Sequence, residues 1–116
     1  MNTVTIRVCS IEETKRNMIA ALSGDKSAQG TFITFVSWEL LYKALSPKRM
    51  DILHTMTGAG ELTFREVASR VGRDVKAVHT DVTALIKSGI IERGENGVIF
   101  PYDEMRFEFS IGHAAA

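Results

Sequence analysis

Short polar and basic side chains gather on one side of a predicted helix at residues 74–88. Its apolar residues recur at the spacing of a single helical stripe: Val75, Val78, Val82, Leu85 and Ile86. The opposite side presents side chains that could contact base edges in DNA: Lys76, Ala77, His79, Thr80 and Thr83. Lysine can bond guanine, while threonine and alanine can touch a thymine methyl group. The helix by itself is equally compatible with an ordinary solvated surface.

A second set of side chains could neutralise DNA phosphates. Its members flank this helix along the chain: Lys48, Arg49, Thr63, Arg65, Arg73, Lys87 and Arg93. The formal net charge is zero, but residues 46–88 hold seven Lys/Arg and five Asp/Glu, whereas residues 89–116 hold two and five. Because phosphate contacts supply much of the affinity for DNA, the middle segment is the candidate surface, and we expect modest affinity per protomer. For Lys48 and Arg49, a solvated helix end is the alternative interpretation.

Local signals predict how these side chains are positioned. Ser46 followed by Pro47 starts one helix, and Thr63 with Glu66 forms a capping box that starts the next. Gly72 suits the left-handed conformation at a tight turn, and Asp74 can cap the helix that follows. The short connection predicts a helix-turn-helix.

A β-hairpin is predicted directly after the candidate DNA-reading helix. Ile90 and Ile91 lead into a strand, residues 94–97 form a turn with Asn-Gly at its tip, and apolar residues return after it. The order of three helices and a two-stranded wing predicts a winged helix-turn-helix.

The remaining segments predict an extension with surplus apolar surface. Residues 3–9 and 31–36 read as strands, residues 11–22 as a helix capped by Ser10 and Glu13, and Ser37 as the cap of a short helix. Residues 102–111 read as a strand that needs the N-terminal strand or a partner chain to pack on. Eight residues are the expected dimer or partner contacts: Val4, Ile6, Val8, Phe32, Phe35, Trp38, Phe107 and Phe109.

The predicted fold class is therefore α+β, a winged helix-turn-helix with an N-terminal strand-helix-strand extension that contributes to dimerisation. We divide the chain into the extension at residues 1–45, the DNA-binding domain at residues 46–111 and a frayed tail at residues 112–116.

Composition and motifs argue against an enzyme. His54, His79, His113 and Cys9 share no metal-ligand spacing, and the chain has no Gly-rich phosphate loop, nucleophile elbow or paired-carboxylate motif. We expect no cofactor and no metal.

No apolar run approaches membrane-spanning length, no signal peptide is evident, and the single cysteine fits a reducing compartment, so a cytoplasmic protein is expected.

The runs ALSPKRMDILHTM and LTFREVASRVGRDVKAVHTDVTALIKSGIIER, with the Gly-Glu-Asn-Gly wing, resemble winged helix-turn-helix regulators of the MarR and ArsR type. The likeness covers about residues 44–109 and is greatest to short prokaryotic MarR-like regulators and antitoxins. It implies a homodimer on a pseudo-palindromic DNA operator, with recognition helices about 34–36 Å apart. In antitoxin relatives a part outside the reading helix holds a toxin, and residues 1–45 would be that part here.

Two functions stay open at this point. The first is a sequence-specific DNA-binding transcriptional regulator, with an antitoxin role as one form of it. The second is a protein-interaction module that neutralises a toxin or another partner without strong DNA binding, which the near-neutral charge and the surplus apolar strands favour.

Overall fold

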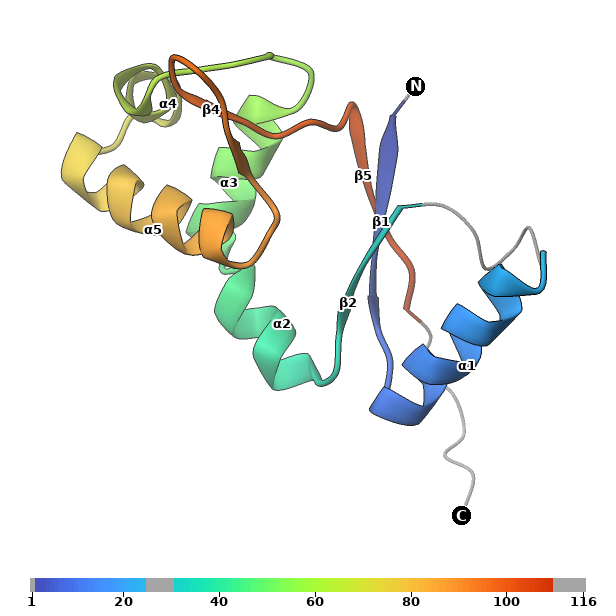
Figure 1. The fold of residues 1–116 in the computed structure, drawn as a ribbon. Coiled ribbons are helices and arrows are strands. Elements are labelled where there is room, and N and C mark those ends of the chain that lie inside the picture. The colour runs from blue at the N-terminus through green and yellow to red at the C-terminus, as the bar shows by residue number, and fades with distance from the viewer. Residues whose placement is uncertain (1, 25–30, 110–116) are drawn as a thin grey trace.

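The computed structural model describes residues 2–24 and 31–109. Within them the chain is an α+β protein with five helices and two small sheets (Figure 1). In chain order the elements are β1 (Thr3–Val8), α1 (Ile11–Leu22), β2 (Phe32–Phe35), α2 (Trp38–Ala44), α3 (Pro47–Met56), α4 (Phe64–Val71), α5 (Val75–Lys87), β3 (Glu92–Arg93), β4 (Val98–Ile99) and β5 (Glu104–Phe107). The predicted tail at residues 112–116 and the end of the predicted strand at residues 102–111 lie outside the described residues.

A parallel three-stranded sheet joins the two ends of the chain. Its order is β2-β1-β5, with Ile6 aligned to Ile33 on one side and to Phe107 on the other. The predicted alternation of β1 is confirmed, because Val4 and Ile6 are fully buried. Of the two partners expected for the last strand, the N-terminal strand or another chain, the structure shows the N-terminal strand, because β5 pairs with β1. The sheet thus combines strands from both predicted segments, and the division between residues 45 and 46 stays a prediction.

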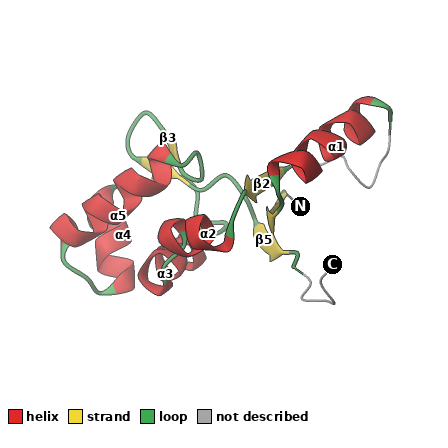
Figure 2. Ribbon diagram, turned by 90° about the horizontal axis from the view of Figure 1, so that it is seen from below, coloured by secondary structure: helices red, strands yellow, loops and turns green. Residues whose placement is uncertain are grey.

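The sheet lies between α1 and the other four helices, as Figures 1 and 2 show. Helix α1 was predicted from apolar residues at helical spacing, and the helix is present. However, its four large apolar side chains are 61% to 86% exposed: Ile11, Met18, Ile19 and Leu22. No residue of α1 is buried, so its apolar stripe does not contribute to the core.

The N-terminus of α1 forms only half of the predicted capping box. Ser10 Oγ accepts the backbone N–H of Glu13 at 3.1 Å. The Glu13 carboxylate, in contrast, accepts the Ser10 hydroxyl at 3.3 Å instead of the Ser10 backbone N–H. The reciprocal backbone bond of a capping box is therefore absent from this pair.

Helices α3, α4 and α5 pack around one core that continues to the sheet. Fully buried side chains include Ile52 and Met56 from α3, Val67 from α4 and Val82 from α5. Val75 departs from the predicted stripe, because it is 40% exposed at the first turn of α5. The inner stripe of α5 consists of Val78, Val82 and Leu85, which fix the helix by apolar burial.

The predicted helix caps around the turn are confirmed. Thr63 Oγ1 accepts the N–H of Glu66, and Glu66 Oε1 accepts the N–H of Thr63, both at 3.1 Å. Gly72 ends α4 with φ 69°, the left-handed conformation that glycine adopts without steric cost from a β-carbon. Asp74 Oδ2 then accepts the N–H groups of Lys76 at 3.1 Å and Ala77 at 3.3 Å. These local bonds set the direction in which α5 leaves the turn.

We predict that Thr63→Ala lowers the free energy of unfolding by about 1 kcal/mol, because the first turn of α4 loses its side-chain acceptor. Thr63→Ser keeps the hydroxyl and is the matched control, with an expected loss well below that of alanine. Urea titration of the three proteins measures the difference. Equal stability of the alanine and serine variants would contradict this role of the cap.

The hairpin of β3 and β4 is anchored to the segment that precedes α4. Leu62 and Val98 exchange backbone hydrogen bonds of 2.9 and 2.8 Å, and Glu61 Oε1 accepts the N–H of Asn96 at 3.0 Å. A β-carbon at Gly97 would collide with the Leu62 backbone, so this close approach requires glycine. The hairpin is thereby held against the same helices that position α5.

Candidate nucleic-acid interface

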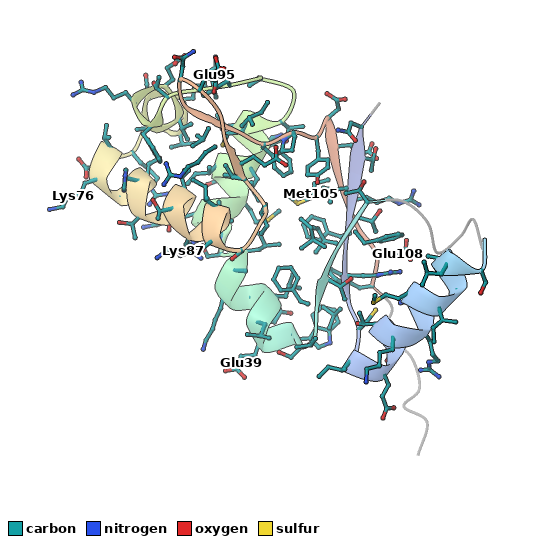
Figure 3. The ribbon with its side chains drawn as sticks, in the orientation of Figure 1. Glu39, Lys76, Lys87, Glu95, Met105 and Glu108 are labelled. Atoms are coloured by element: carbon teal, nitrogen blue, oxygen red, sulfur yellow. The ribbon has the colours of Figure 1, made fainter. Side chains whose placement is uncertain are left out.

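The outer side of α5 is accessible over most of its length. Lys76, Ala77, His79 and Thr80 are exposed, and Thr83 is half-buried. Figure 3 shows Lys76 near the beginning of α5 and Lys87 near its end, both at the outside of the molecule. The structure therefore brings the predicted base-contacting residues onto one helix face.

Two of these side chains are oriented by neighbours. The His79 ring packs against the Phe64 ring with centroids 4.5 Å apart, and His79 Nδ1 lies 3.5 Å from Thr83 Oγ1. Thr80 is exposed, and its Oγ1 donates to the Lys76 carbonyl at 3.2 Å, so its hydroxyl proton is used within the helix. Phe64 was not among the predicted site residues, because its contact with His79 depends on how α4 crosses α5.

Five predicted phosphate or base contacts are exposed cations without an ion pair to any described residue. They come from the start of α3, the first turn of α4, both ends of α5 and the hairpin: Lys48, Arg65, Lys76, Lys87 and Arg93. An unpaired lysine or arginine can bind a phosphate without first breaking an internal contact.

Arg49 and Arg73 differ from these cations, because both are ion-paired within the chain, and their role as phosphate contacts stays a prediction. Arg49 Nε lies 3.1 Å from Asp81 Oδ1, and Arg73 Nη2 lies 2.9 Å from Asp81 Oδ2. The three side chains are only 17% to 22% exposed. One carboxylate on α5 thus takes up two guanidinium groups, one from α3 and one from the turn before α5.

This trio, which we call the Asp81 clamp (Arg49, Arg73 and Asp81), also reaches α2. Arg49 Nη1 donates to the carbonyls of Lys43 at 3.1 Å and Ala44 at 3.4 Å, at the end of α2. The clamp therefore ties α2, α3 and the turn to the middle of α5.

Electrostatics keep the clamp charged. Partial burial by itself would raise the pKa of Asp81, but the hydrogen bonds and charges of Arg49 and Arg73 outweigh it and hold that pKa below its usual value. Asp81 was not predicted as a site residue. Its pairing with Arg73, eight positions earlier, could have been suspected from the short turn, whereas its pairing with Arg49 across 32 positions has no local signal.

The remaining predicted phosphate contacts are limited by their surroundings. Thr63 is exposed, but its hydroxyl oxygen accepts the capping hydrogen bond of α4. Arg93 lies in β3 beside Glu92, and Glu95 projects at the hairpin tip in Figure 3. An acidic tip disfavours deep insertion of this hairpin between phosphates.

The predicted dimer or partner contacts fall into three groups. Val4 and Ile6 are fully buried in the chain's own core, so their prediction as contacts to another chain is wrong. Val8, Phe32 and Phe35 are half-buried, and the Arg7 guanidinium covers the Phe32 ring at 3.9 Å. Trp38, Phe107 and Phe109 are 39% to 40% exposed and form one aromatic cluster, with Trp38 and Phe109 centroids 4.8 Å apart.

Catalytic features are sparse in residues 2–24 and 31–109. No group of three His, Cys, Asp or Glu side chains there could hold a metal ion. Burial raises the pKa of the Cys9 thiol, which keeps it protonated and a weak nucleophile. None of the described helices is long and apolar enough to cross a membrane.

The helices, hairpin and cation-bearing face of α5 define an α+β protein with a candidate anionic-ligand surface. Residues 44–107 match the model of the HVO_A0114 family, and the chain belongs to that family. No curated protein and no solved structure is significantly similar to the chain. The matched region begins in α2 and ends in β5, so it includes the whole candidate interface. The family description carries no function, and the resemblance to MarR and ArsR regulators stays a prediction.

Proposed function

We propose that this protein is a sequence-specific DNA-binding transcriptional regulator in which α3, α4, α5 and the β3–β4 hairpin form a winged helix-turn-helix. The observation that carries the proposal is the outer face of α5: short side chains at its centre, Lys76 and Lys87 at its ends, and further unpaired cations at Lys48 and Arg65. A helix of this width enters the major groove, where short polar side chains can approach the base edges.

The division of labour within this interface follows from the charges. Lys76, Ala77, His79, Thr80 and Thr83 contact bases, whereas Lys48, Arg65 and Lys87 contact phosphates. Asp74 occupies the first free N–H groups of α5, so the helix N-terminus contributes little to phosphate binding. With Arg49 and Arg73 paired to Asp81, one protomer binds DNA weakly, and a homodimer on a pseudo-palindromic operator supplies the remaining affinity.

Selection from a random duplex DNA library tests sequence specificity. The full-length protein should enrich an inverted repeat whose half-sites are about 10–11 base pairs apart, one helical turn of DNA. Enrichment of a single unrepeated half-site would contradict the dimeric mode. No enrichment over input at low salt would contradict the proposed function.

The salt dependence of binding tests the phosphate contacts. Arg65→Gln should weaken binding to all duplexes alike and reduce the slope of log K against log salt by about 0.9 per DNA-bound protomer, because one fewer phosphate is neutralised. Arg16→Gln on α1 removes the same charge from a distant element and should leave the slope unchanged. Fluorescence anisotropy titrations at salt concentrations between about 50 and 200 mM give the slopes for the two variants. Identical slopes for the wild type and Arg65→Gln would show that Arg65 does not contact a phosphate.

A second candidate function is the protein-interaction module, with a toxin as one form of partner. The exposed apolar stripe of α1, formed by Ile11, Met18, Ile19 and Leu22, favours it, because large apolar side chains on one helix face are typical of a binding surface. A small protein encoded beside this chain would co-purify with it, and Ile19→Glu would abolish that association. Retention of the partner by the Ile19→Glu protein would exclude the α1 stripe as its binding surface.

A further inference from the structure

Strand β5 is a sheet edge with unused backbone hydrogen-bonding groups. The backbone N–H groups of Glu104 and Glu108 donate to the carbonyl of Asn2, just before β1, at 3.3 Å and to that of Ile6 in β1 at 3.0 Å. Because successive residues of a strand direct these groups to opposite sides, those of Met105 and Phe107 point away from β1. In Figure 2 no described helix or strand is drawn beyond β5 on that side. Such an edge can accept another strand.

The apolar face of β5 is incompletely covered beside this edge. Phe107 and Phe109 are each 40% exposed and lie 5.8 Å apart between ring centroids. A shallow groove adjoins them between α3 and β5, lined by Met50, Leu53, His54, Thr57, Met105 and Phe107. The exposed apolar surface therefore coincides with the free edge, as is typical of protein interfaces.

The charge pattern of residues 104–108, which are β5 and the residue after it, suits a second copy of the same segment as its occupant. In an antiparallel pair centred on Phe107, Arg106 of one copy lies opposite Glu108 of the other, and the two-fold axis repeats this ion pair. Met105 then lies opposite Phe109, so all the apolar side chains meet on one face. If the pair were centred on Arg106 instead, the two copies of Arg106 would lie opposite each other, and Glu104 of one copy would lie opposite Glu108 of the other. Like charges directly opposite are destabilising, which excludes that register.

We propose that two copies of the chain dimerise by antiparallel pairing of β5 with β5, centred on Phe107, to form one continuous six-stranded sheet. The pairing uses the outward N–H and C=O groups of Met105 and Phe107 and buries the exposed phenylalanines. This pairing specifies how the two protomers of the homodimer in the proposed function contact each other. The experiments below contain no DNA. A monomeric result would therefore overturn this dimer without deciding whether the chain binds DNA.

Disulfide trapping tests the register. In a Cys9→Ala background, Phe107→Cys places two cysteines about 5.5 Å apart between Cα atoms across the two-fold axis, within disulfide range. Mild oxidation should convert most of the protein to a covalent dimer. Met105→Cys is the matched control, because its two copies lie about 14 Å apart in this register and should cross-link only slightly. Efficient cross-linking at residue 105 and not at residue 107 would overturn the register.

A charge exchange tests the same interface with Cys9 intact. Arg106→Glu should raise the dimer dissociation constant about tenfold or more, because two like-charged pairs replace two ion pairs. The double variant Arg106→Glu, Glu108→Arg restores opposite charges and should recover dimerisation. Sedimentation equilibrium gives the three constants. A wild-type protein that stays monomeric throughout the concentration range, or a double variant as weak as the single one, would overturn the proposal.

Discussion

Asp81→Asn is expected to lower the free energy of unfolding by about 1–3 kcal/mol at neutral pH, the range for lost hydrogen bonds to charged groups. Asparagine has nearly the shape of aspartate, so packing is retained, but it can no longer neutralise two guanidinium groups. Arg49 and Arg73 would both lose the negative charge that each of them pairs with. Since the clamp joins α2, α3 and the turn to α5, the variant should also loosen the orientation of α5.

The pH dependence of the stability difference tests whether the charge of the Asp81 carboxylate causes it. The hydrogen bonds and charges of Arg49 and Arg73 hold the pKa of Asp81 below the ordinary value of an aspartate, so the stabilising contribution of its carboxylate is complete above that ordinary value. The contribution is lost as the pH falls through the folded pKa. The stability difference between wild type and Asp81→Asn should therefore be constant near neutrality and shrink below about pH 4.

Urea titrations at several pH values measure this difference. Asp51→Asn is the matched control: Asp51 is exposed on α3, makes no ion pair with a described residue, and should change stability by less than about 0.5 kcal/mol. If Asp81→Asn is as stable as wild type at neutral pH, the clamp does not stabilise the fold.

The double charge reversal Lys76→Glu, Lys87→Glu is expected to weaken DNA binding about 100-fold or more. Each lysine contributes about 1–3 kcal/mol when it contacts a base, and each also neutralises a phosphate when it contacts the backbone. Both side chains are exposed, so folding should be preserved, which circular dichroism verifies. Anisotropy titration with the selected duplex measures the loss.

A control with the same change in net charge separates local from general electrostatics. Lys15→Glu, Arg16→Glu alters two exposed residues of α1, across the sheet from α5. We expect this variant to bind DNA within a fewfold of wild type. Equal losses in the two double variants would mean that net charge, and not the α5 face, governs binding.

Features decided within a few residues could be predicted from the sequence. The caps at Ser46, Thr63 and Asp74 each depend on a side chain that bonds the neighbouring backbone. Gly72 depends on the left-handed backbone that glycine adopts, and the turn at residues 94–97 on a backbone hydrogen bond between Gly94 and Gly97. For the same reason the helices and strands of the described residues follow the predicted order.

Features decided by distant packing could not be predicted in the same way. Arg49 looked like a free cation because its partner Asp81 is 32 positions away, and the two meet only once α3 and α5 have packed. Val4 and Ile6 were predicted as contacts to another chain, whereas β5 and the helices already cover them. The apolar stripe of α1 has the periodicity of a core helix, but periodicity does not tell whether the chain itself or a partner covers the stripe.

Backbone NMR of the isotope-labelled protein, titrated with duplex DNA, tests most directly whether the outer face of α5 binds DNA. The proposed interface predicts the largest amide shifts at residues 74–83, smaller ones near Lys48 and Arg65, and almost none in α1. An unchanged spectrum at low salt, or shifts confined to α1 and the sheet, would contradict it.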